Sequence, residues 1–263
     1  MPTIVFANPK GGAGKTTAAL LLASELKSAK ADVCIIDADP EKWITQWGQR
    51  TQELQIPIFP DVREDTIIDV IDDCASKHAF VIVDLEGTAS LLASDAIAVA
   101  DLVIIPVQGS SMDARAADRI IKLVKNQERK SGKSVPMRVL MSRTSAAVTS
   151  RAQRDVESQL SEANIPQMRT AIVERAAYRE ITGLGGLLRD LDRKEVRNLD
   201  KAIENAAAYA TEVTMILKEA ERAQKDVRVR LIENKKLLKD DIVPPQTQWK
   251  DTKLTGKQLE SAR

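Results

Sequence analysis

The sequence lacks an excess of charge of either sign. Its 263 residues include 39 basic and 38 acidic side chains, which gives a formal net charge of +1. Such a balance produces no strong field, so any contact with nucleic acid must come from a local patch of positive charge. With 43% hydrophobic and 29% charged residues, the composition is typical of a globular chain, and the length favours one main domain.

Cysteine is scarce, and long apolar runs are missing. Cys34 lies in a short apolar run and Cys74 stands alone in an acidic stretch, so we expect neither a disulfide framework nor a metal or redox pair. A shared iron–sulfur cluster would need two suitably placed cysteines per subunit and is excluded on the same ground. No secretion signal is recognisable, and no apolar run approaches the roughly 18 residues of a membrane span. The sequence therefore predicts a cytoplasmic protein.

Short runs of apolar, β-favouring residues recur along the N-terminal half of the chain. Stretches with helical spacing, such as Thr16–Ser28 and Asp113–Arg129, separate them. This alternation predicts an α/β fold, with a mostly parallel, twisted sheet covered by helices on both faces and a ligand site at the carboxyl ends of the strands. The expected strands are Thr3–Ala7, Asp32–Asp37, Ala79–Asp84, Leu102–Val107 and Met137–Ser142.

The C-terminal part has a different composition. From about Arg189 to Lys239 the chain is rich in Ala, Leu, Glu, Lys and Arg and contains neither proline nor glycine, which favours long helices. From Lys239 onward, mostly polar residues and the pair Pro244-Pro245 predict a flexible tail. The expected organisation is a main domain over residues 1–220, a helical extension over 221–239 and a tail over 240–263.

A glycine-rich segment connects the first expected strand to the first expected helix. Its glycines allow backbone N–H groups to converge on phosphate oxygens, and the following helix N-terminus adds partial positive charge. Lys15 is expected to pair with the β and γ phosphates of a nucleotide, and Thr16 is expected to ligate Mg²⁺. The candidate phosphate-binding residues are Gly11, Gly12, Ala13, Gly14, Lys15, Thr16 and Thr17.

The segment departs from the ordinary phosphate loop at Pro9, where the general pattern has a glycine. With Lys10 after it, the segment resembles the deviant Walker A motif of the ParA/MinD family of ATPases. The resemblance implies a P-loop NTPase fold, ATP and Mg²⁺ as ligands, and catalytic roles for Lys10 and Lys15. It also implies that Lys10 reaches the phosphates of a partner subunit, so that the ATP-bound form is a homodimer.

Two acidic segments follow two of the expected strands. The run from Asp37 through Asp39 to Pro40 resembles the family's segment after its second strand, which implies that Asp39 positions the attacking water and lies near Mg²⁺. The alternative for either aspartate is a turn or helix-capping role. The apolar run from Phe80 ends at Asp84 in the form of a Walker B strand, whose acid would hold Mg²⁺ through water. Thr16, Asp39 and Asp84 are thus the expected metal-site residues.

The residues after Asp84 depart from most of the family. Leu-Glu-Gly-Thr at positions 85–88 is closer to the Asp-x-x-Gly form of small plasmid partition ATPases and of VirC1-like conjugation proteins, which implies that Gly87 offers its N–H to the γ phosphate. Glu86 adds a second carboxylate near phosphate, and the sequence leaves its orientation open. Arg143 ends a later strand where the family contacts adenine, so it joins the candidate nucleotide-binding residues.

The resemblance covers about residues 2–220 and favours a ParA-type partition ATPase. Such a switch dimerises with ATP, binds DNA nonspecifically, associates with the nucleoid, and hydrolyses ATP when a ParB-like or centromere-binding partner protein stimulates it. Because the first strand begins at Thr3, we expect no upstream helix-turn-helix domain for operator binding. The candidate DNA contacts are the basic residues Arg115, Arg119, Lys122, Lys125, Arg129, Lys130, Lys133, Arg151 and Arg154, although each could equally belong to an ordinary solvated helix face.

Three alternatives accompany this hypothesis. A VirC1-like helper of conjugative DNA transfer would use the same machinery. A MinD-like membrane switch would need the basic stretch Arg228–Leu238 as its anchor, but that stretch is short and lacks aromatics, so we expect no membrane partner. A nonenzymatic scaffold would require an inactive phosphate site, which the complete set of motif residues argues against.

Overall fold

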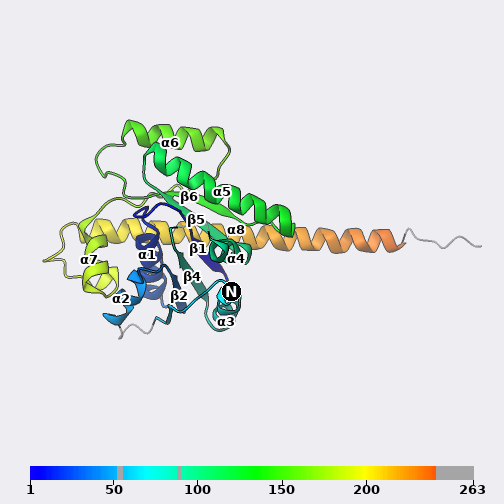
Figure 1. Cartoon of the computed structure of the whole chain (residues 1–263), viewed down its shortest axis with the longest axis horizontal. Coiled ribbons are helices and arrows are strands. Elements are labelled where there is room, and N and C mark those ends of the chain that lie inside the picture. Colours follow the sequence, from blue (N-terminus) through cyan, green and yellow to red (C-terminus); the bar gives the residue numbers. More distant parts are fainter. Residues whose placement is uncertain (52–55, 88–89, 241–263) are drawn as a thin grey trace, which may run out of the picture. The chain divides into compact units, whose positions relative to one another are not determined.

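A computed structural model describes residues 1–51, 56–87 and 90–240 of the chain. It divides the chain into two compact units, Met1–Ala220 and Glu221–Arg263. Within the described residues, six strands form one sheet in the order β3-β2-β4-β1-β5-β6, and every neighbouring pair is parallel (Figure 1). The strands are β1 (Thr3–Phe6), β2 (Val33–Ala38), β3 (Ile58–Phe59), β4 (Phe80–Leu85), β5 (Leu102–Val107) and β6 (Met137–Met141).

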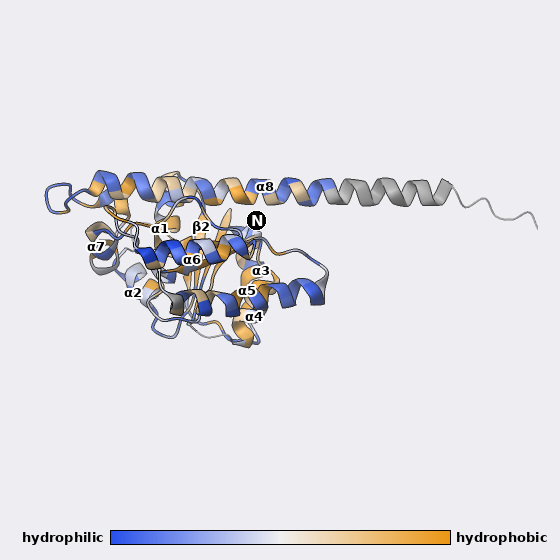
Figure 2. Ribbon diagram, turned by 90° about the horizontal axis from the view of Figure 1, so that it is seen from above, coloured by the Kyte–Doolittle hydropathy of each residue, from blue (hydrophilic) through white to orange (hydrophobic). Residues whose placement is uncertain are grey.

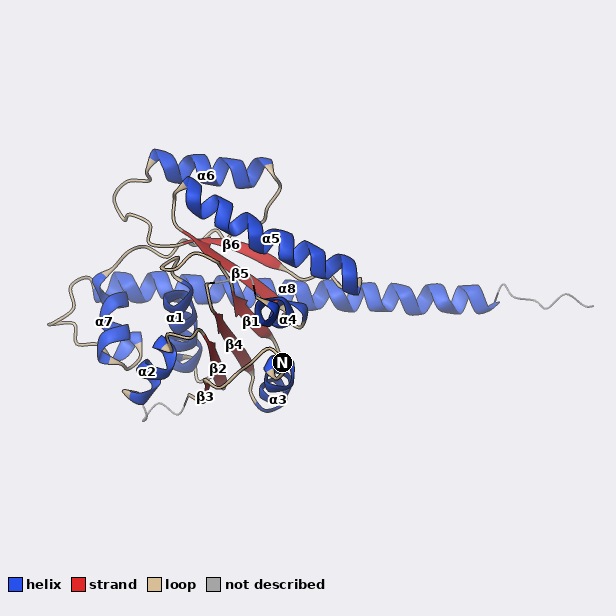
Figure 3. Ribbon diagram, viewed as in Figure 1, coloured by secondary structure: helices blue, strands red, loops and turns tan. Residues whose placement is uncertain are grey.

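Helices cover both faces of this sheet, and Figure 3 shows the red strands between them. On one face the core combines strand residues with α1 (Lys15–Ser28), α2 (Trp43–Gln49), α7 (Ala176–Leu184) and the first turns of α8 (Leu199–Asp240). The core of the other face combines them with α3 (Ile67–Lys77), α4 (Leu91–Ala98), α5 (Ser111–Ser131) and α6 (Arg151–Glu162). Because both faces are covered, β2 and β5 are buried along their whole length, which explains their near-continuous apolar sequences.

Helix α1 lies at the centre of the first of these layers. Five successive residues, Ala18 to Leu22, are at most 1% exposed, so this helix is buried on nearly every side and not only along one stripe. The start of α8 packs on it through Tyr209, which is fully buried and whose hydroxyl lies 3.4 Å from the Ala18 carbonyl oxygen. Hydrophobic and hydrophilic residues alternate along these first turns of α8 in Figure 2. These contacts hold α1 in place directly after the loop that connects it to β1.

The carboxyl ends of the strands meet at one edge of the sheet. In the parallel register Phe6 of β1 is opposite Asp84 of β4, and Asp84 is opposite Asp37 of β2. The segments that follow β1, β2, β4, β5 and β6 consequently converge there. The sequence-based prediction of a mostly parallel sheet with helices on both faces is confirmed.

Two local features differ from the expectations. The short strand β3 was not expected, because two residues give no periodicity to detect. A long helix was expected from about Arg189, but a 3-10 turn occupies Leu188–Asp190 and α8 begins only at Leu199. Asn198 precedes α8 with a φ of +57°, a left-handed conformation that interrupts helix and that asparagine tolerates better than most residues. The expected tail lies outside the described residues from position 241 on.

Both cysteines are buried in the core on the α3 side of the sheet. Burial and the neighbouring Cys74 thiol raise the pKa of Cys34 above its usual range, and burial likewise raises the pKa of Cys74. The sequence placed these residues in unrelated segments, whereas the fold brings them together as core residues. In the described part of the chain, no helix is both long and apolar enough to cross a membrane.

Candidate nucleotide-binding site

The loop between β1 and α1 has the backbone of an anion-binding turn. Gly12 and Gly14 have φ values of +73° and +96°, which residues with a side chain rarely adopt. A Cβ atom on Gly14 would also lie 3.2 Å from the Cβ and Oγ atoms of Ser142. Gly14 precedes α1, whose first turn contains no acidic residue, so the free N–H groups of Lys15 and its successors form an electropositive end.

A cavity of about 440 Å³ opens above this loop. It gathers every predicted phosphate-loop residue from Gly11 to Thr17 together with the predicted Asp39, Gly87 and Arg143. Segments separated by more than a hundred positions therefore contribute to one site. Four lining residues were not among the predicted site residues, namely Pro40, Glu41, Trp43 and Glu86. Glu86, whose orientation the sequence left open, thus lies at the cavity.

Lys15 supplies the positive charge of this cavity. Its side chain is largely buried, and among the described residues its ammonium group forms no ion pair. Gly87 lies close by, because a Cβ atom placed on it would be 3.7 Å from Lys15 Nζ and 3.4 Å from the Pro9 carbonyl oxygen. A lysine held without a carboxylate partner beside converging N–H groups favours binding of a phosphate group.

Thr16, which lines the cavity, contacts the buried Asp84. The Thr16 hydroxyl donates a hydrogen bond of 2.7 Å to Asp84 Oδ2, whereas Asp84 Oδ1 is buried and has no hydrogen-bond partner among the described residues. Burial raises the pKa of Asp84 from its ordinary value of 3.8 to about 7, although the hydrogen bond from Thr16 and the charge of Lys15 act in the opposite direction. An unpaired buried carboxylate oxygen next to a threonine hydroxyl is a donor set that suits Mg²⁺.

Asp37 and Asp39 differ in their surroundings although they are two positions apart. Asp37 is fully buried, and its Oδ2 accepts hydrogen bonds from the backbone N–H and the hydroxyl of Thr45, at 2.8 and 2.6 Å. It thereby ties the start of α2 to the end of β2. Asp39 lines the cavity, and its Oδ1 accepts the Glu41 N–H at 3.0 Å in a local turn. Asp39 is therefore the aspartate of this pair that faces the ligand space.

Lys42 holds the loop after β2 in place, and the sequence analysis did not identify this residue. Its φ is +52°, and its ammonium group donates to the carbonyl oxygens of Asp37 and Pro60, at 2.8 and 2.6 Å. The two bonds connect the loop after β2 with the segment after β3. Only the turn signal around Pro40 could have indicated this region, and that signal does not reveal where a lysine side chain points.

Arg143 lies at the side of the cavity with a φ of +53°. Its Nε donates to Glu174 Oε2 at 3.2 Å, and Arg179 lies near the other oxygen of the same carboxylate. These residues border a small second cavity of about 30 Å³, which also involves Thr17 and Tyr178. The predicted adenine contact thus lies next to the start of α1, with polar and aromatic side chains around it.

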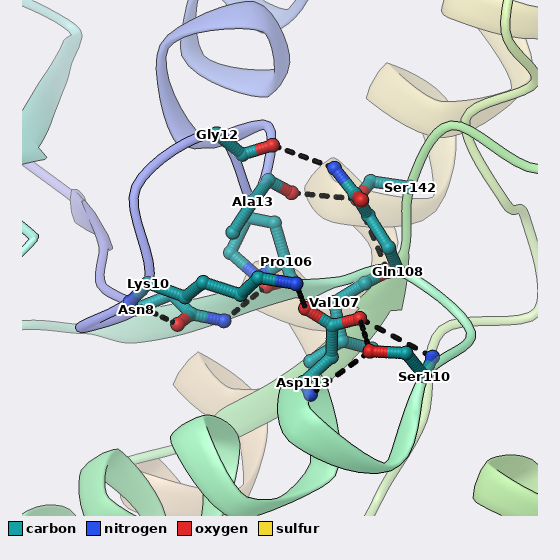
Figure 4. A network of polar contacts seen from close by, with 10 residues as sticks. All are labelled: Asn8, Lys10, Gly12, Ala13, Pro106, Val107, Gln108, Ser110, Asp113 and Ser142. Carbon is teal, nitrogen blue, oxygen red and sulfur yellow. Dashed lines mark hydrogen bonds and ion pairs between the residues drawn. The ribbon is translucent and has the colours of Figure 1, made fainter.

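Lys10 is, with Asp84, one of two predicted site residues that do not line the cavity. Its Nζ contacts Asp113 Oδ1 at 2.6 Å, in the first turn of α5 (Figure 4). The same figure shows two further ties to the loop, from Gln108 to the Gly12 carbonyl oxygen (2.6 Å) and from Ser142 to the Ala13 carbonyl oxygen (2.7 Å). The segments after β5 and β6 therefore hold the phosphate loop from one side.

The nine candidate DNA contacts are all exposed. Six lie on α5, Lys133 follows its end, and Arg151 and Arg154 open α6. The helix face is not purely basic, because Lys122 pairs with Asp118 at 2.6 Å. Arg228–Leu238, the candidate membrane anchor, belongs to α8, but its side chains lie outside the described part of the chain.

A phosphate loop between the first strand and first helix of a parallel sheet, with an aspartate ending the neighbouring strand, defines a P-loop nucleoside triphosphatase fold. The family model described as VirC1 protein matches residues 1–229. The chain belongs to this family, and its fold is of the ParA/MinD type.

Similarity to individual proteins agrees with this assignment. The chain is 34% identical over 223 residues to "Protein ParA" of Rhizobium radiobacter, a match that covers 84% of this chain and 100% of the relative. Among solved structures, MinD from Aquifex aeolicus is 19% identical with a TM-score of 0.61, covering 81% of this chain and 97% of that one. An ATP complex of McdA from Cyanothece is 17% identical with a TM-score of 0.62, covering 81% and 96%. The predicted resemblance to the ParA/MinD family is confirmed.

Proposed function

We propose that this chain is a Mg²⁺-dependent ATPase that acts as a dimeric switch in DNA partition. The observation that supports this most is the cavity that joins the phosphate loop, Asp39 and Gly87 around the ammonium group of Lys15, which forms no ion pair within the described part of the chain. ATP is the nucleotide because the chain belongs to a family of ParA/MinD type, and an ATP complex is known for the structurally similar McdA.

The triphosphate would lie along the loop from Gly11 to Thr17, with Lys15 against the β and γ phosphates. The base at the other end of the nucleotide would lie beside Arg143 and the small cavity next to it. The pair formed by Arg143 and Glu174 would then open or shift to admit the base, since both groups border that space.

Thr16 and Asp84 are the residues that would hold Mg²⁺, with Asp39 near it on the cavity wall. The hydroxyl and the partnerless Asp84 Oδ1 fit this cation, and the charge of the ion would favour the ionised form of Asp84. No group of three or more His, Cys, Asp or Glu side chains within the described residues is arranged to hold a metal alone. Phosphate oxygens and water would complete the coordination, as Mg²⁺ ordinarily requires. When bound, Mg²⁺ would neutralise charge that develops on the transferred phosphoryl group.

Hydrolysis requires a positioned water and compensation of negative charge. Asp39 faces the cavity and its carboxylate would accept a hydrogen bond from the attacking water. Gly87 would offer its N–H to the γ phosphate, because its backbone lies against Pro9 and Lys15. Lys10 would supply the second positive charge in the partner subunit of the ATP-bound homodimer.

The basic residues of α5 and the start of α6 would bind nonspecific DNA through phosphate contacts. The match to "Protein ParA" along that relative's whole length supports partition as the process, with a ParB-like or centromere-binding protein as the stimulating partner. A role as helper in conjugative DNA transfer is the second candidate, because the matching family model is that of VirC1. Both roles place the protein in the cytoplasm, on the nucleoid or another DNA cargo.

The test is binding to nonspecific duplex DNA and to anionic liposomes, each with ADP, ATP or no nucleotide, over a salt series. We expect ATP-dependent DNA binding that weakens with salt, with a log–log slope of about −0.9 for each phosphate contact. The double variant Arg119→Glu/Lys125→Glu on α5 should lose this binding, whereas Lys201→Glu/Lys218→Glu on α8 is the charge-matched control.

Two outcomes would contradict the proposal. ATP-dependent binding to liposomes without DNA binding would favour a MinD-like membrane switch. Equal DNA binding with ATP, with ADP and without nucleotide would contradict a nucleotide-dependent switch. Stimulation of ATP hydrolysis by the replicon's own centromere-binding protein, or by its relaxosome proteins, would then separate partition from conjugative transfer.

A further inference from the structure

The segment that borders the small second cavity runs beside the residues that follow β6. The Ile172 N–H donates to the Met141 carbonyl oxygen at 2.8 Å, and the Thr144 N–H donates to the Ile172 carbonyl oxygen at 3.1 Å. The Glu174 N–H continues this pattern by donating to the Thr144 carbonyl oxygen at 2.8 Å. Residues 171–174 therefore extend the sheet past the end of β6 in a parallel arrangement.

The other edge of this segment is held by a single side chain of α8. Backbone groups alternate along an extended chain, so the Ala171 carbonyl and the Val173 N–H are directed away from the residues that follow β6. Asn205 bonds both of them: its Nδ2 donates to the Ala171 carbonyl oxygen at 2.8 Å, and its Oδ1 accepts the Val173 N–H at 3.0 Å. One carboxamide, which carries a donor and an acceptor side by side, thus takes the place of a neighbouring strand.

The same amide also contacts an aromatic part of the cavity wall. The Tyr178 hydroxyl lies 3.0 Å from Asn205 Oδ1 and 2.8 Å from the Ala202 carbonyl oxygen. Tyr178 is buried and lines the small cavity together with Val173 and Glu174. Asn205 therefore supports two parts of this wall, the extended segment and the tyrosine, without lining the cavity itself.

We propose that Asn205 is a positioning residue for the base of the bound nucleotide. This inference rests on the proposed function, which puts the base beside Arg143 and the small cavity. Arg143 and Glu174 belong to the two paired segments and form an ion pair of 3.2 Å, so the place of the segment 171–174 sets where Glu174 lies relative to Arg143. Backbone groups that lose their hydrogen bonds in a partly buried segment are costly, so without the Asn205 amide the segment shifts and the base loses contacts.

The phosphate half of the site depends on other contacts. The Gln108 and Ser142 side chains donate to the carbonyl oxygens of Gly12 and Ala13 and hold the phosphate loop. Asn205 does not line the larger cavity above that loop. It therefore acts on one end of the nucleotide, and we expect its loss to affect ligands that carry a base and not those that carry phosphate alone.

The test compares ADP with pyrophosphate, which offers two linked phosphates without ribose or base. Displacement of a ribose-labelled fluorescent ADP from the full chain, with Mg²⁺ present, gives the dissociation constant of each ligand. In Asn205→Ala the constant for ADP should rise by about 5- to 150-fold, the range that corresponds to two hydrogen bonds, while that for pyrophosphate should change less than about twofold. Asn205→Asp keeps the acceptor for Val173 but loses the donor to Ala171, so its constant for ADP should rise by a smaller factor.

Glu212→Ala is the matched control on the same helix. The Glu212 carboxylate accepts the N–H groups of Arg169 and Thr170 at 2.7 and 2.8 Å, so this variant also removes two hydrogen bonds from α8 to the neighbouring backbone. Neither Arg169 nor Thr170 lines the small cavity. Glu212→Ala should therefore lower the melting temperature about as much as Asn205→Ala, but keep the ratio of the two dissociation constants within about twofold of wild type.

The inference is overturned if the folded Asn205 variants keep the wild-type ratio, or if their affinity for pyrophosphate falls as much as that for ADP. An equal change of the ratio in Glu212→Ala would also overturn it, because α8 would then act through general stability. If Asn205→Ala does not fold, Asn205→Asp supplies the same comparison. A wild-type chain that binds ADP no more tightly than pyrophosphate would instead contradict the proposed base site, so the wild-type measurement separates the two failures.

Discussion

Replacing Asp84 by asparagine should stabilise the nucleotide-free protein, even though Asp84 is a proposed metal-site residue. The side chain is 1% exposed at the end of β4, and burial raises its pKa to about 7 in the folded state, against 3.8 ordinarily. Thr16 donates to one oxygen, and the other has no partner in the part of the chain that the structure describes. The protein thus holds a carboxylate whose ionised form is unfavourable until a cation arrives.

The sign and size of the effect follow from linkage. Between about pH 4 and pH 7 the folded state binds the Asp84 proton and the unfolded state does not, so the stability that this group contributes is lost as pH rises through the folded pKa. A difference of about three pKa units corresponds to an upper limit of about 4 kcal/mol at pH 8. Asparagine is neutral at every pH and its amide oxygen can still accept the Thr16 hydrogen bond, so Asp84→Asn avoids this loss.

The measurement is urea unfolding of wild type and Asp84→Asn at pH 5 and pH 8, without nucleotide and with a chelator. We expect the variant to be more stable than wild type by about 1–2 kcal/mol at pH 5, where the unfolded chain has already lost the Asp84 proton, and by up to about 4 kcal/mol at pH 8. Asp73→Asn, an exposed carboxylate paired with Lys77, is the control and should show no such difference. A variant that is less stable than wild type at pH 8 would refute the reasoning, because it would mean that Lys15 and Thr16 favour the ionised form more than burial disfavours it.

Four further outcomes are expected. Lys15→Gln should abolish binding of a fluorescent ATP analogue, and unchanged affinity would contradict the proposed contact of Lys15 with phosphate. Lys10→Gln should still bind the analogue as a monomer but should fail to dimerise in sedimentation measurements. Gly14→Ala should weaken nucleotide affinity at least about tenfold, because the new Cβ atom would lie 3.2 Å from Ser142 and the residue would have to adopt a φ of +96°. Wild-type affinity would contradict this prediction and show that the loop adjusts. Leu22→Ala in the buried α1 should lower the free energy of unfolding by about 2–5 kcal/mol in urea titration, and a loss below about 1 kcal/mol would contradict tight packing there.

The architecture was predictable because it depends on patterns that repeat along the chain. Runs such as Phe80 to Val83 are apolar at every position, which only a strand covered on both faces requires. The phosphate loop was predictable because its chemistry is contained in eight adjacent residues, 10–17. The short strand β3 and the late start of α8 were not, since the first has too few residues for a period and the second depends on one left-handed backbone conformation at Asn198.

The residues around the side of the cavity were less predictable than those of the phosphate loop. Glu86 and Arg143 were named from the sequence without a known orientation, and the fold places both on the cavity. Trp43 and Lys42 gave no signal, because neither belongs to a motif and each acts through the direction of its side chain. The particular roles assigned to Lys10, Lys15, Thr16, Asp39 and Asp84 remain predictions that the experiments above address.

The partner of Lys10 illustrates why spacing along a sequence cannot reveal such a contact. Lys10 and Asp113 belong to segments that follow β1 and β5, strands that are adjacent in the sheet although β2, β3 and β4 intervene in the chain. Neighbouring parallel strands deliver their following segments to the same edge, so strand order and not sequence distance decides which side chains meet. The resemblance to a family implied a destination for Lys10 in a partner subunit, whereas the order of the strands explains the contact that Lys10 makes with Asp113 within the single chain.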